Sequence, residues 1–203
     1  MDALLLSLLE LYQQWLKSCP TGQAELASAV ATLKTLPPAQ TGPSNEPMVV
    51  QKYLPAVLAQ ATDPIVAQTL QQICAVADQL DWVTMPPEYM GADFVEQFAY
   101  VRLGGPNIAL IRPTVFPTSQ LKFGLSLQAP NLFYPSHWHR AVEFYGILSG
   151  TALWQWGRRP FTPQPPPAFI HHPSNLPHAM HTQDQPLLTT YIWVGEIDAP
   201  IES

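Results

Sequence analysis

The hydrophobic residues divide the chain into a first part with helical spacing and a second part made of short apolar runs. In residues 2–18, leucine, tyrosine and tryptophan recur every three or four positions, which makes a broad apolar stripe on a helix. The same spacing predicts helices over residues 22–36 and 49–60. A fourth helix is predicted from Asp63 to about residue 80, because an aspartate followed directly by a proline is a typical helix start.

After Trp82 the pattern changes to short runs that are rich in β-branched and aromatic residues and are bounded by proline or glycine. Runs of this kind at this spacing predict a sandwich or barrel of antiparallel strands. We therefore expect an α+β chain that is mainly β, with a helical N-terminal region (residues 1–82) packed on a β-barrel domain (residues 83–203). The predicted strands lie within residues 107–116, 121–130, 141–150, 151–157, 166–173 and 187–196.

The run YPSHWHRAVEFYGILSG (residues 134–150) holds side chains that can bind a metal. Four of them occupy odd positions: His137, His139, Glu143 and Tyr145. Side chains of the same parity point to one face of a strand, so one strand, or two strands joined by a short turn, would direct all four into the same space. Two imidazoles and a carboxylate in one place are the donors of a divalent metal site.

Charge and composition exclude some classes of function. The formal net charge is −6 and the nine Lys and Arg residues are scattered, so we expect no nucleic-acid partner. No apolar run reaches membrane-spanning length, and the first residues lack the features of a secretory signal. We therefore expect a cytoplasmic protein with no membrane partner. Cys19 and Cys74 form no metal-binding or redox pattern, and we expect both to be buried free thiols in helices.

The candidate metal ligands fit two motifs of a known superfamily. The pattern H-x-H-x3-E-x6-G, which begins at His137 and ends at Gly150, resembles the first motif of the cupins. The segment from Pro173 to His178 resembles the second cupin motif, P-x-G-x-x-H. In each motif asparagine replaces one glycine, and asparagine also enters left-handed backbone conformations. These replacements are Asn131 and Asn175.

The cupin resemblance implies a jelly-roll barrel, in which strands far apart in sequence direct side chains into one cavity. It also implies one divalent transition metal per chain, and the donor set suits Fe, Zn, Mn, Ni or Co without choosing among them. Cupins commonly pair through sheet edges, so a homodimer is possible. The implied ligands are His137, His139, Glu143 and His178.

A narrower resemblance covers the whole chain. The helical N-terminal region, the length of 203 residues and the tyrosines around the ligands are similar to the short type of bacterial cupin-type dimethylsulfoniopropionate (DMSP) lyases. The ligands implied by that family are His139, Glu143, His178 and Tyr145. His137 would then lie in the pocket and approach the metal or the substrate, while Tyr134 and Trp193 match pocket aromatics of the family.

The implied reaction is the β-elimination of DMSP, a zwitterionic sulfonium carboxylate, to dimethyl sulfide and acrylate. A cation acidifies the α-proton of a bound carboxylate, and a base must then remove that proton. A nearby cation also lowers the pKa of a tyrosine, so Tyr145 is the candidate base and Tyr134 the second choice. Aromatic faces can hold a sulfonium by cation–π attraction. The candidate faces are Trp138, Trp154, Trp156, Tyr134, Tyr191 and Trp193.

Two other functions stay open at this stage. An Fe-dependent dioxygenase or an isomerase acting on another small carboxylate would use the same barrel. A non-enzymatic metal-binding sensor would use the leucine-rich helical face to contact a partner.

The sequence also leaves the place of several side chains open. Trp154 and Trp156 share parity, and packing under the helices is the alternative to a place in the pocket. Parity does not decide whether two cationic side chains, Arg112 and Lys122, face the pocket. The remaining histidines are expected on surfaces or in loops, and these are His171, His172 and His181.

Overall fold

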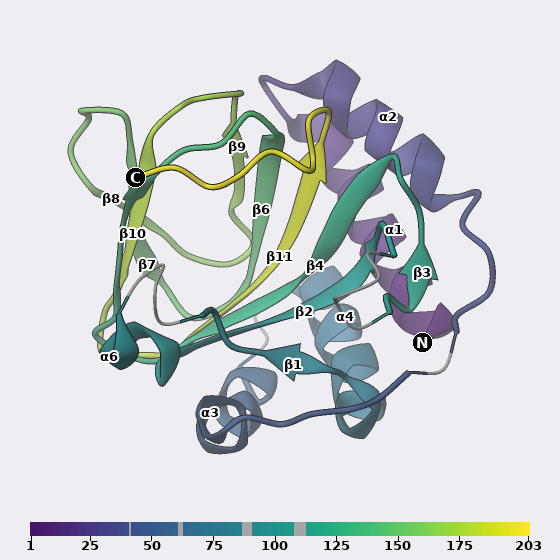
Figure 1. Cartoon of the computed structure of the whole chain (residues 1–203), viewed down its shortest axis with the longest axis horizontal. Coiled ribbons are helices and arrows are strands. Elements are labelled where there is room, and N and C mark those ends of the chain that lie inside the picture. The colour runs from purple at the N-terminus through teal and green to yellow at the C-terminus, as the bar shows by residue number, and fades with distance from the viewer. Residues whose placement is uncertain (41, 61–62, 87–90, 108–112) are drawn as a thin grey trace.

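Helices form the first part of the chain, as predicted. The computed structural model describes residues 1–203 except 41, 61–62, 87–90 and 108–112 (Figure 1). The helices are α1 (Asp2–Ser18), α2 (Gln23–Leu33), α3 (Met48–Leu58), α4 (Pro64–Ala75) and the 3-10 helix η1 (Ala77–Gln79). The carboxylate of Asp63 caps α4, because it accepts hydrogen bonds from the backbone amides of Ile65 (2.9 Å) and Val66 (3.2 Å).

Two sheets form the second part of the chain. Their strands are β1 (Trp82–Val83), β2 (Phe98–Gly105), β3 (Phe116–Pro117), β4 (Leu121–Gln128), β5 (Phe133–His137), β6 (Val142–Ser149), β7 (Ala152–Trp156), β8 (Thr162–Gln164), β9 (Phe169–His172), β10 (His178–Thr182) and β11 (Leu187–Val194), with a short helix α6 (Ala92–Val95) before β2. The larger sheet has seven strands in the order β1-β2-β4-β11-β6-β9, with β3 paired to β2, and the smaller has the order β5-β10-β7-β8. The strand predicted within residues 107–116 falls largely on positions 108–112, which lie outside the described residues.

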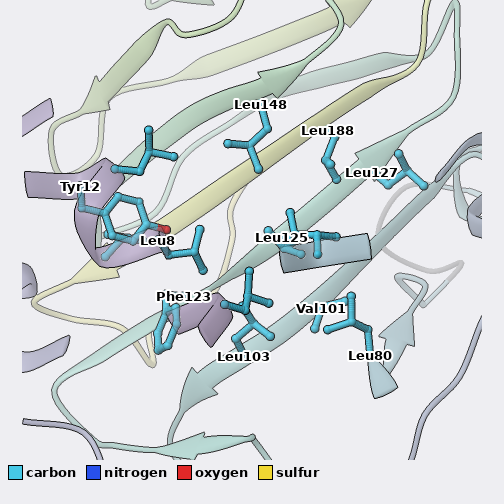
Figure 2. Close-up of a cluster of buried hydrophobic side chains, with 14 of the residues drawn as sticks. Leu8, Tyr12, Leu80, Val101, Leu103, Phe123, Leu125, Leu127, Leu148 and Leu188 are labelled. Carbon is cyan, nitrogen blue, oxygen red and sulfur yellow. The ribbon is translucent and has the colours of Figure 1, made fainter. Parts of the chain in front are cut away.

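The larger sheet carries helices on one face and faces the smaller sheet with the other (Figure 1). In β4, Phe123, Leu125 and Leu127 point toward the helices, because alternate side chains of a strand face opposite ways. Figure 2 shows these side chains with Leu8 and Tyr12 of α1 in one buried cluster. The helices thus cover one sheet of the barrel. The predicted boundary between the helical region and the barrel domain, between residues 82 and 83, falls inside β1. The division of the chain into these two domains stays a prediction.

The other face of the larger sheet and the smaller sheet enclose the interior of the barrel. In β6, Tyr145 points into this interior, whereas Phe144 packs on the helix side. Glu143 has the parity of Tyr145 and lies on the same side. His137 enters from the end of β5 in the smaller sheet, and its ring centroid is 4.2 Å from that of His178. The odd-numbered residues of the motif therefore converge from two facing sheets that are joined by a short turn.

Asparagine adopts a left-handed backbone at both positions where the cupin motifs have glycine. The φ angle is 58° at Asn131 and 60° at Asn175. Asparagine tolerates this region better than other side chains do, so the motif turns are retained without glycine, as predicted. In the part of the chain that the structure describes, every helix is too short or too polar to cross a membrane.

The two cysteines differ in their exposure. Cys19 is buried, as predicted, although it directly follows α1 instead of lying within it. The prediction is wrong for Cys74, which is exposed. The buried face of α4 runs through Leu70 and Ile73. Cys74 follows Ile73 and is turned by about 100° around the helix, which carries its side chain off that face.

Candidate metal centre

Three buried side chains bring their donor atoms together inside the barrel. The Nε2 atoms of His139 and His178 lie 3.1 Å and 3.2 Å from Oε2 of Glu143. The ligand atoms of these three residues all lie within 4.8 Å of one another. His139 follows β5, Glu143 is on β6 and His178 opens β10, so the fold and not the local sequence assembles the group. This spacing is short enough for one cation to contact all three.

The histidine rings are oriented by backbone carbonyls. The Nδ1 atoms lie 2.9 Å from a carbonyl oxygen two positions away in the pairs His137–Pro135, His139–Ala141 and His178–Leu176. A carbonyl oxygen only accepts, so each Nδ1 carries a proton and donates it. In the neutral ring this leaves Nε2 with a free lone pair. Metal-binding histidines are commonly held by such a hydrogen bond from the other ring nitrogen.

An unpartnered nitrogen shows that the donor set fits a metal. Among the described residues, His178 Nε2 is one of few buried side-chain polar atoms without a hydrogen-bond partner, although Glu143 Oε2 lies 3.2 Å away. A neutral imidazole lone pair and a carboxylate oxygen are both acceptors, so neither satisfies the other. A cation between them would satisfy both. Two imidazoles and one carboxylate suit a divalent transition metal, and they do not choose among Fe, Mn, Co, Ni and Zn.

Glu143 and His139 stabilise each other's charged forms. Burial alone raises the pKa of Glu143, but the charge of His139 and hydrogen bonds from His139 and His172 outweigh burial and hold this pKa well below its usual value. Burial likewise lowers the pKa of His139, and Glu143 outweighs it, so the pKa of His139 is raised. A proton on His139 Nε2 would occupy the position that a cation would take, so the two would compete for this site.

His137 lies beside the three-residue group without belonging to it. Its ring is 4.2 Å from the ring of His178 and 6.3 Å from the ring of His139, measured between centroids. Burial, and then the nearby charge of His178, lowers the pKa of His137 to about 3, so this imidazole is neutral at ordinary pH. The sequence left its role open between ligand and pocket residue, and that role stays a prediction.

The two candidate tyrosines come from strands of different sheets. Tyr145, on β6, lies two residues from Glu143 on the same face of the strand, and burial followed by the charge of Glu143 raises its pKa well above the usual value. Tyr134, on β5, stacks on His137 with the ring centroids 4.3 Å apart, and its hydroxyl lies 3.8 Å from the sulfur of Met85. Burial and then Glu143 also raise the pKa of Tyr134. Without a cation, both side chains are neutral phenols.

Trp193 contacts two members of the group. On β11 it lies directly beside Glu143 in the strand register, and its Nε1 donates a hydrogen bond of 2.6 Å to Glu143 Oε1. Its ring lies against His139, with the centroids 4.1 Å apart. Trp193 was predicted as a pocket aromatic. The structure places it in the site and shows that its polar edge is directed at the carboxylate.

Sequence reasoning missed His172 and left the place of Trp154 open between the pocket and the helix side. His172 was expected on a surface or in a loop, but it is completely buried on β9, where it pairs with Glu143 of β6. Its Nδ1 is 3.3 Å from Glu143 Oε2, and its Nε2 accepts a hydrogen bond of 2.9 Å from Trp154 Nε1. Trp154 therefore lies inside the barrel beside Tyr145 and does not pack under the helices. Burial and then the charge of His178 lower the pKa of His172 to about 3.

The other candidates take no part in the group. His171 points to the helix side, where its Nδ1 is 3.0 Å from Thr21 Oγ1, and His181 packs against Phe133. Lys122 is paired with Asp198 at 3.2 Å. Trp138 pairs through its backbone with Glu202, Trp156 packs on the interior cluster, and the Tyr191 hydroxyl donates to the backbone of Val101. Arg112 lies outside the described residues.

A family model decides what kind of protein carries this site. The model of the dimethylsulfoniopropionate lyases matches residues 22–189. The chain belongs to the DMSP lyase family. The match contains all the candidate metal ligands and both candidate bases, whereas Tyr191 and Trp193 lie beyond its end. The resemblance drawn from the motifs is therefore confirmed at the level of the family.

Individual DMSP lyases resemble the chain over nearly all of its length. The dimethylsulfoniopropionate lyase DddQ of Ruegeria pomeroyi is 30% identical over 183 residues, which make up 85% of this chain and 85% of that protein. The crystal structure of that lyase has a TM-score of 0.68 and 26% identity, and the alignment covers 95% of both chains. A crystal structure of the DMSP lyases RdDddP and RnDddQII gives a TM-score of 0.70 and 25% identity over 97% of this chain and 94% of the other. Alignments of this extent include the helical region, and they confirm the predicted fold of N-terminal helices followed by a cupin barrel.

Proposed function

We propose that this chain is a metal-dependent lyase that cleaves DMSP to dimethyl sulfide and acrylate by base-catalysed β-elimination. The observation that carries the proposal is the buried group of His139, Glu143 and His178, with Tyr145 two residues from Glu143 on the same strand face, in a member of the DMSP lyase family. Relatives that are named as DMSP lyases align with nearly the whole chain, which supports DMSP as the substrate.

The proposed ligands of the cation are His139, Glu143 and His178. When bound, a divalent cation supplies an electrophilic partner for the substrate carboxylate and a positive charge that opposes the effect of Glu143 on the pKa of Tyr145. His137 lies outside the three-residue group and is neutral, so we assign it to the substrate side of the site. Its Nδ1 is already engaged by a backbone carbonyl, which leaves Nε2 as an acceptor.

Tyr145 is the proposed base. Its phenolate oxygen takes the α-proton of DMSP, and the electrons of the C–H bond form the double bond between Cα and Cβ as the C–S bond breaks. The electron pair of the C–S bond remains on sulfur, which releases neutral dimethyl sulfide and leaves acrylate. Burial excludes water around this oxygen and so favours proton transfer from the substrate. Tyr134 is the second candidate, and it belongs to the same buried interior cluster as Tyr145.

The aromatic rings around Tyr134 would hold the sulfonium. Tyr134 is flanked by Phe94 and Phe98, with ring centroids 5.0 Å and 5.5 Å away. Aromatic faces attract a soft cation without neutralising it, so the leaving group is bound without being trapped. Trp193 was predicted to bind substrate as well. We propose that it also holds Glu143, because its indole N–H is directed at that carboxylate.

The proposal is tested with metal-stripped protein that is reloaded with each of Fe, Mn, Co, Ni and Zn and then given DMSP. Dimethyl sulfide in the headspace and acrylate in solution should appear in equal amounts. Tyr145→Phe should lower the rate by about 10²–10⁴-fold, the usual contribution of a general base, while the metal content stays unchanged. Tyr53→Phe is the matched control, because Tyr53 lies on α3 and packs on the helix-side core. A fully metallated sample that releases no dimethyl sulfide would refute the proposal, and oxygen uptake on substrate addition would favour a dioxygenase instead.

Membership of the family does not establish the substrate, the oligomeric state or the location of this protein, and these stay predictions. The substrate is proposed to be a single small zwitterion, and the possible homodimer and the cytoplasmic location rest on the sequence alone. Sedimentation of the purified protein at several concentrations measures the oligomeric state directly.

A further inference from the structure

A series of hydrogen bonds links Trp154 through His172 to Glu143. Trp154 Nε1 donates to His172 Nε2 over 2.9 Å, and His172 Nδ1 lies 3.3 Å from Glu143 Oε2. All three side chains are buried, and they come from β7 in the smaller sheet and from β9 and β6 in the larger one. This series of hydrogen bonds therefore spans the interior of the barrel and ends on the proposed carboxylate ligand.

The indole of Trp154 determines which atoms donate and which accept in this series of hydrogen bonds. An indole N–H can only donate, so His172 Nε2 must accept from Trp154. In the neutral ring the single proton then sits on Nδ1, from which it is donated to Glu143. This arrangement is the reverse of that in His139 and His178, whose Nδ1 atoms are engaged by backbone carbonyls and whose Nε2 atoms face Glu143. Both nitrogens of His172 are thus occupied, and neither offers a lone pair to a metal.

We propose that His172 is a positioning residue, held by Trp154, that orients the Glu143 carboxylate for metal binding. A carboxylate can rotate about its last bond, and a donor on each oxygen removes that freedom. His172 supplies the donor to Oε2 and Trp193 supplies the donor to Oε1 at 2.6 Å. Hydrogen bonds of this kind to metal ligands typically change metal affinity by about 10–100-fold. The inference rests on the metal centre of the proposed function.

His172 also touches a second member of the group. Its ring stacks on His178, with centroids 3.8 Å apart and an angle of 16° between the planes. The stack and the hydrogen bond can be separated by substitution. Phenylalanine at position 172 keeps an aromatic ring against His178 and removes the donor to Glu143. Asparagine removes the ring and keeps an N–H donor close to the position of Nδ1.

The experiment measures metal affinity without substrate. Metal-stripped protein competes with a chromophoric chelator for Zn²⁺ and Co²⁺. His172→Phe should weaken binding by about 10–100-fold, and His172→Asn should recover part of that loss. Trp154→Phe should weaken binding by a smaller factor, because the Nδ1 proton of His172 is then no longer fixed. His171→Phe is the matched control on the same strand. It makes the same change on the helix side, where His171 stacks on Phe144, and should leave affinity unchanged.

Each outcome has a defined meaning. The inference is overturned if folded His172→Phe binds both metals within twofold of the wild type, or if His172→Asn binds as weakly as His172→Phe. Thermal melting of the metal-free proteins shows which variants are folded, and His172→Asn with Trp154→Phe decides the question if His172→Phe does not fold. A wild-type protein that binds neither metal would instead overturn the metal centre itself. Dimethyl sulfide release by the wild type is measured separately, so failure of the proposed reaction does not affect this test.

Discussion

Replacing Leu8 by alanine tests whether the helices and the barrel are one folding unit. Leu8 lies on α1, is completely buried, and belongs to the cluster between the helices and the larger sheet (Figure 2). The substitution removes three carbon atoms. At about 0.8 kcal/mol for each buried carbon group, the lost transfer free energy is roughly 2.4 kcal/mol, and the cavity left behind raises the cost to about 2.5–5 kcal/mol. For a chain of this size, that lowers the melting temperature by about 5–20 °C.

The assay is urea unfolding followed by circular dichroism, together with amide exchange in peptides from α1 and β10. If the cluster couples the two parts, Leu8→Ala lowers the free energy of unfolding by the same amount in both peptides. Leu6→Ala is the control, because Leu6 is on the same helix and 60% exposed, and it should cost less than about 0.5 kcal/mol. Two separate transitions, with β10 unaffected by Leu8→Ala, would show that the helical region is an independent unit and would refute the reasoning.

Two further predictions concern stability. Tyr12→Phe removes a buried hydrogen bond between the Tyr12 hydroxyl of α1 and Thr190 of β11, and should lower the free energy of unfolding by about 1 kcal/mol, because Thr190 still donates to the carbonyl of Gly124. An unchanged urea midpoint would contradict this. Loading the protein with metal at 100 times its dissociation constant should stabilise it by about 2.7 kcal/mol, which a chelator removes. His178→Ala should abolish this chelator-sensitive shift in melting temperature, and a shift that persists in the variant would place the metal elsewhere.

The helical half of the fold could be predicted closely because its signals are local. Apolar spacing located α1, and an aspartate before a proline located the start of α4. The same spacing already placed Cys74 off the buried face of α4. The wrong prediction for this cysteine came from giving the usual burial of its residue type more weight than its position on the helix.

The site could be predicted only as far as its motifs reached. His139, Glu143 and His178 stand at motif spacing, and the structure brings them together. His172 carries no such signal, since two adjacent histidines on a strand point to opposite faces. Which of the two faces the interior depends on the pairing of β9 with β6, across 29 residues of chain. The place of Trp154 could not be predicted for the same reason, because parity within β7 does not reveal which sheet that strand joins.

The charge balance of the centre is consistent with the proposed substrate. In the described site, Glu143 is the one carboxylate within the group, and burial keeps His137 and His172 neutral. As long as Tyr145 is a neutral phenol, a divalent cation at this position would therefore leave one uncompensated positive charge among buried side chains, which is costly in a low-dielectric interior. A substrate carboxylate compensates it, whereas a neutral or cationic ligand does not. The sulfonium then needs a surface that attracts it without a further charge, and the rings around Tyr134 provide such a surface. The arrangement thus favours a small zwitterion whose anionic and cationic ends are a few bonds apart.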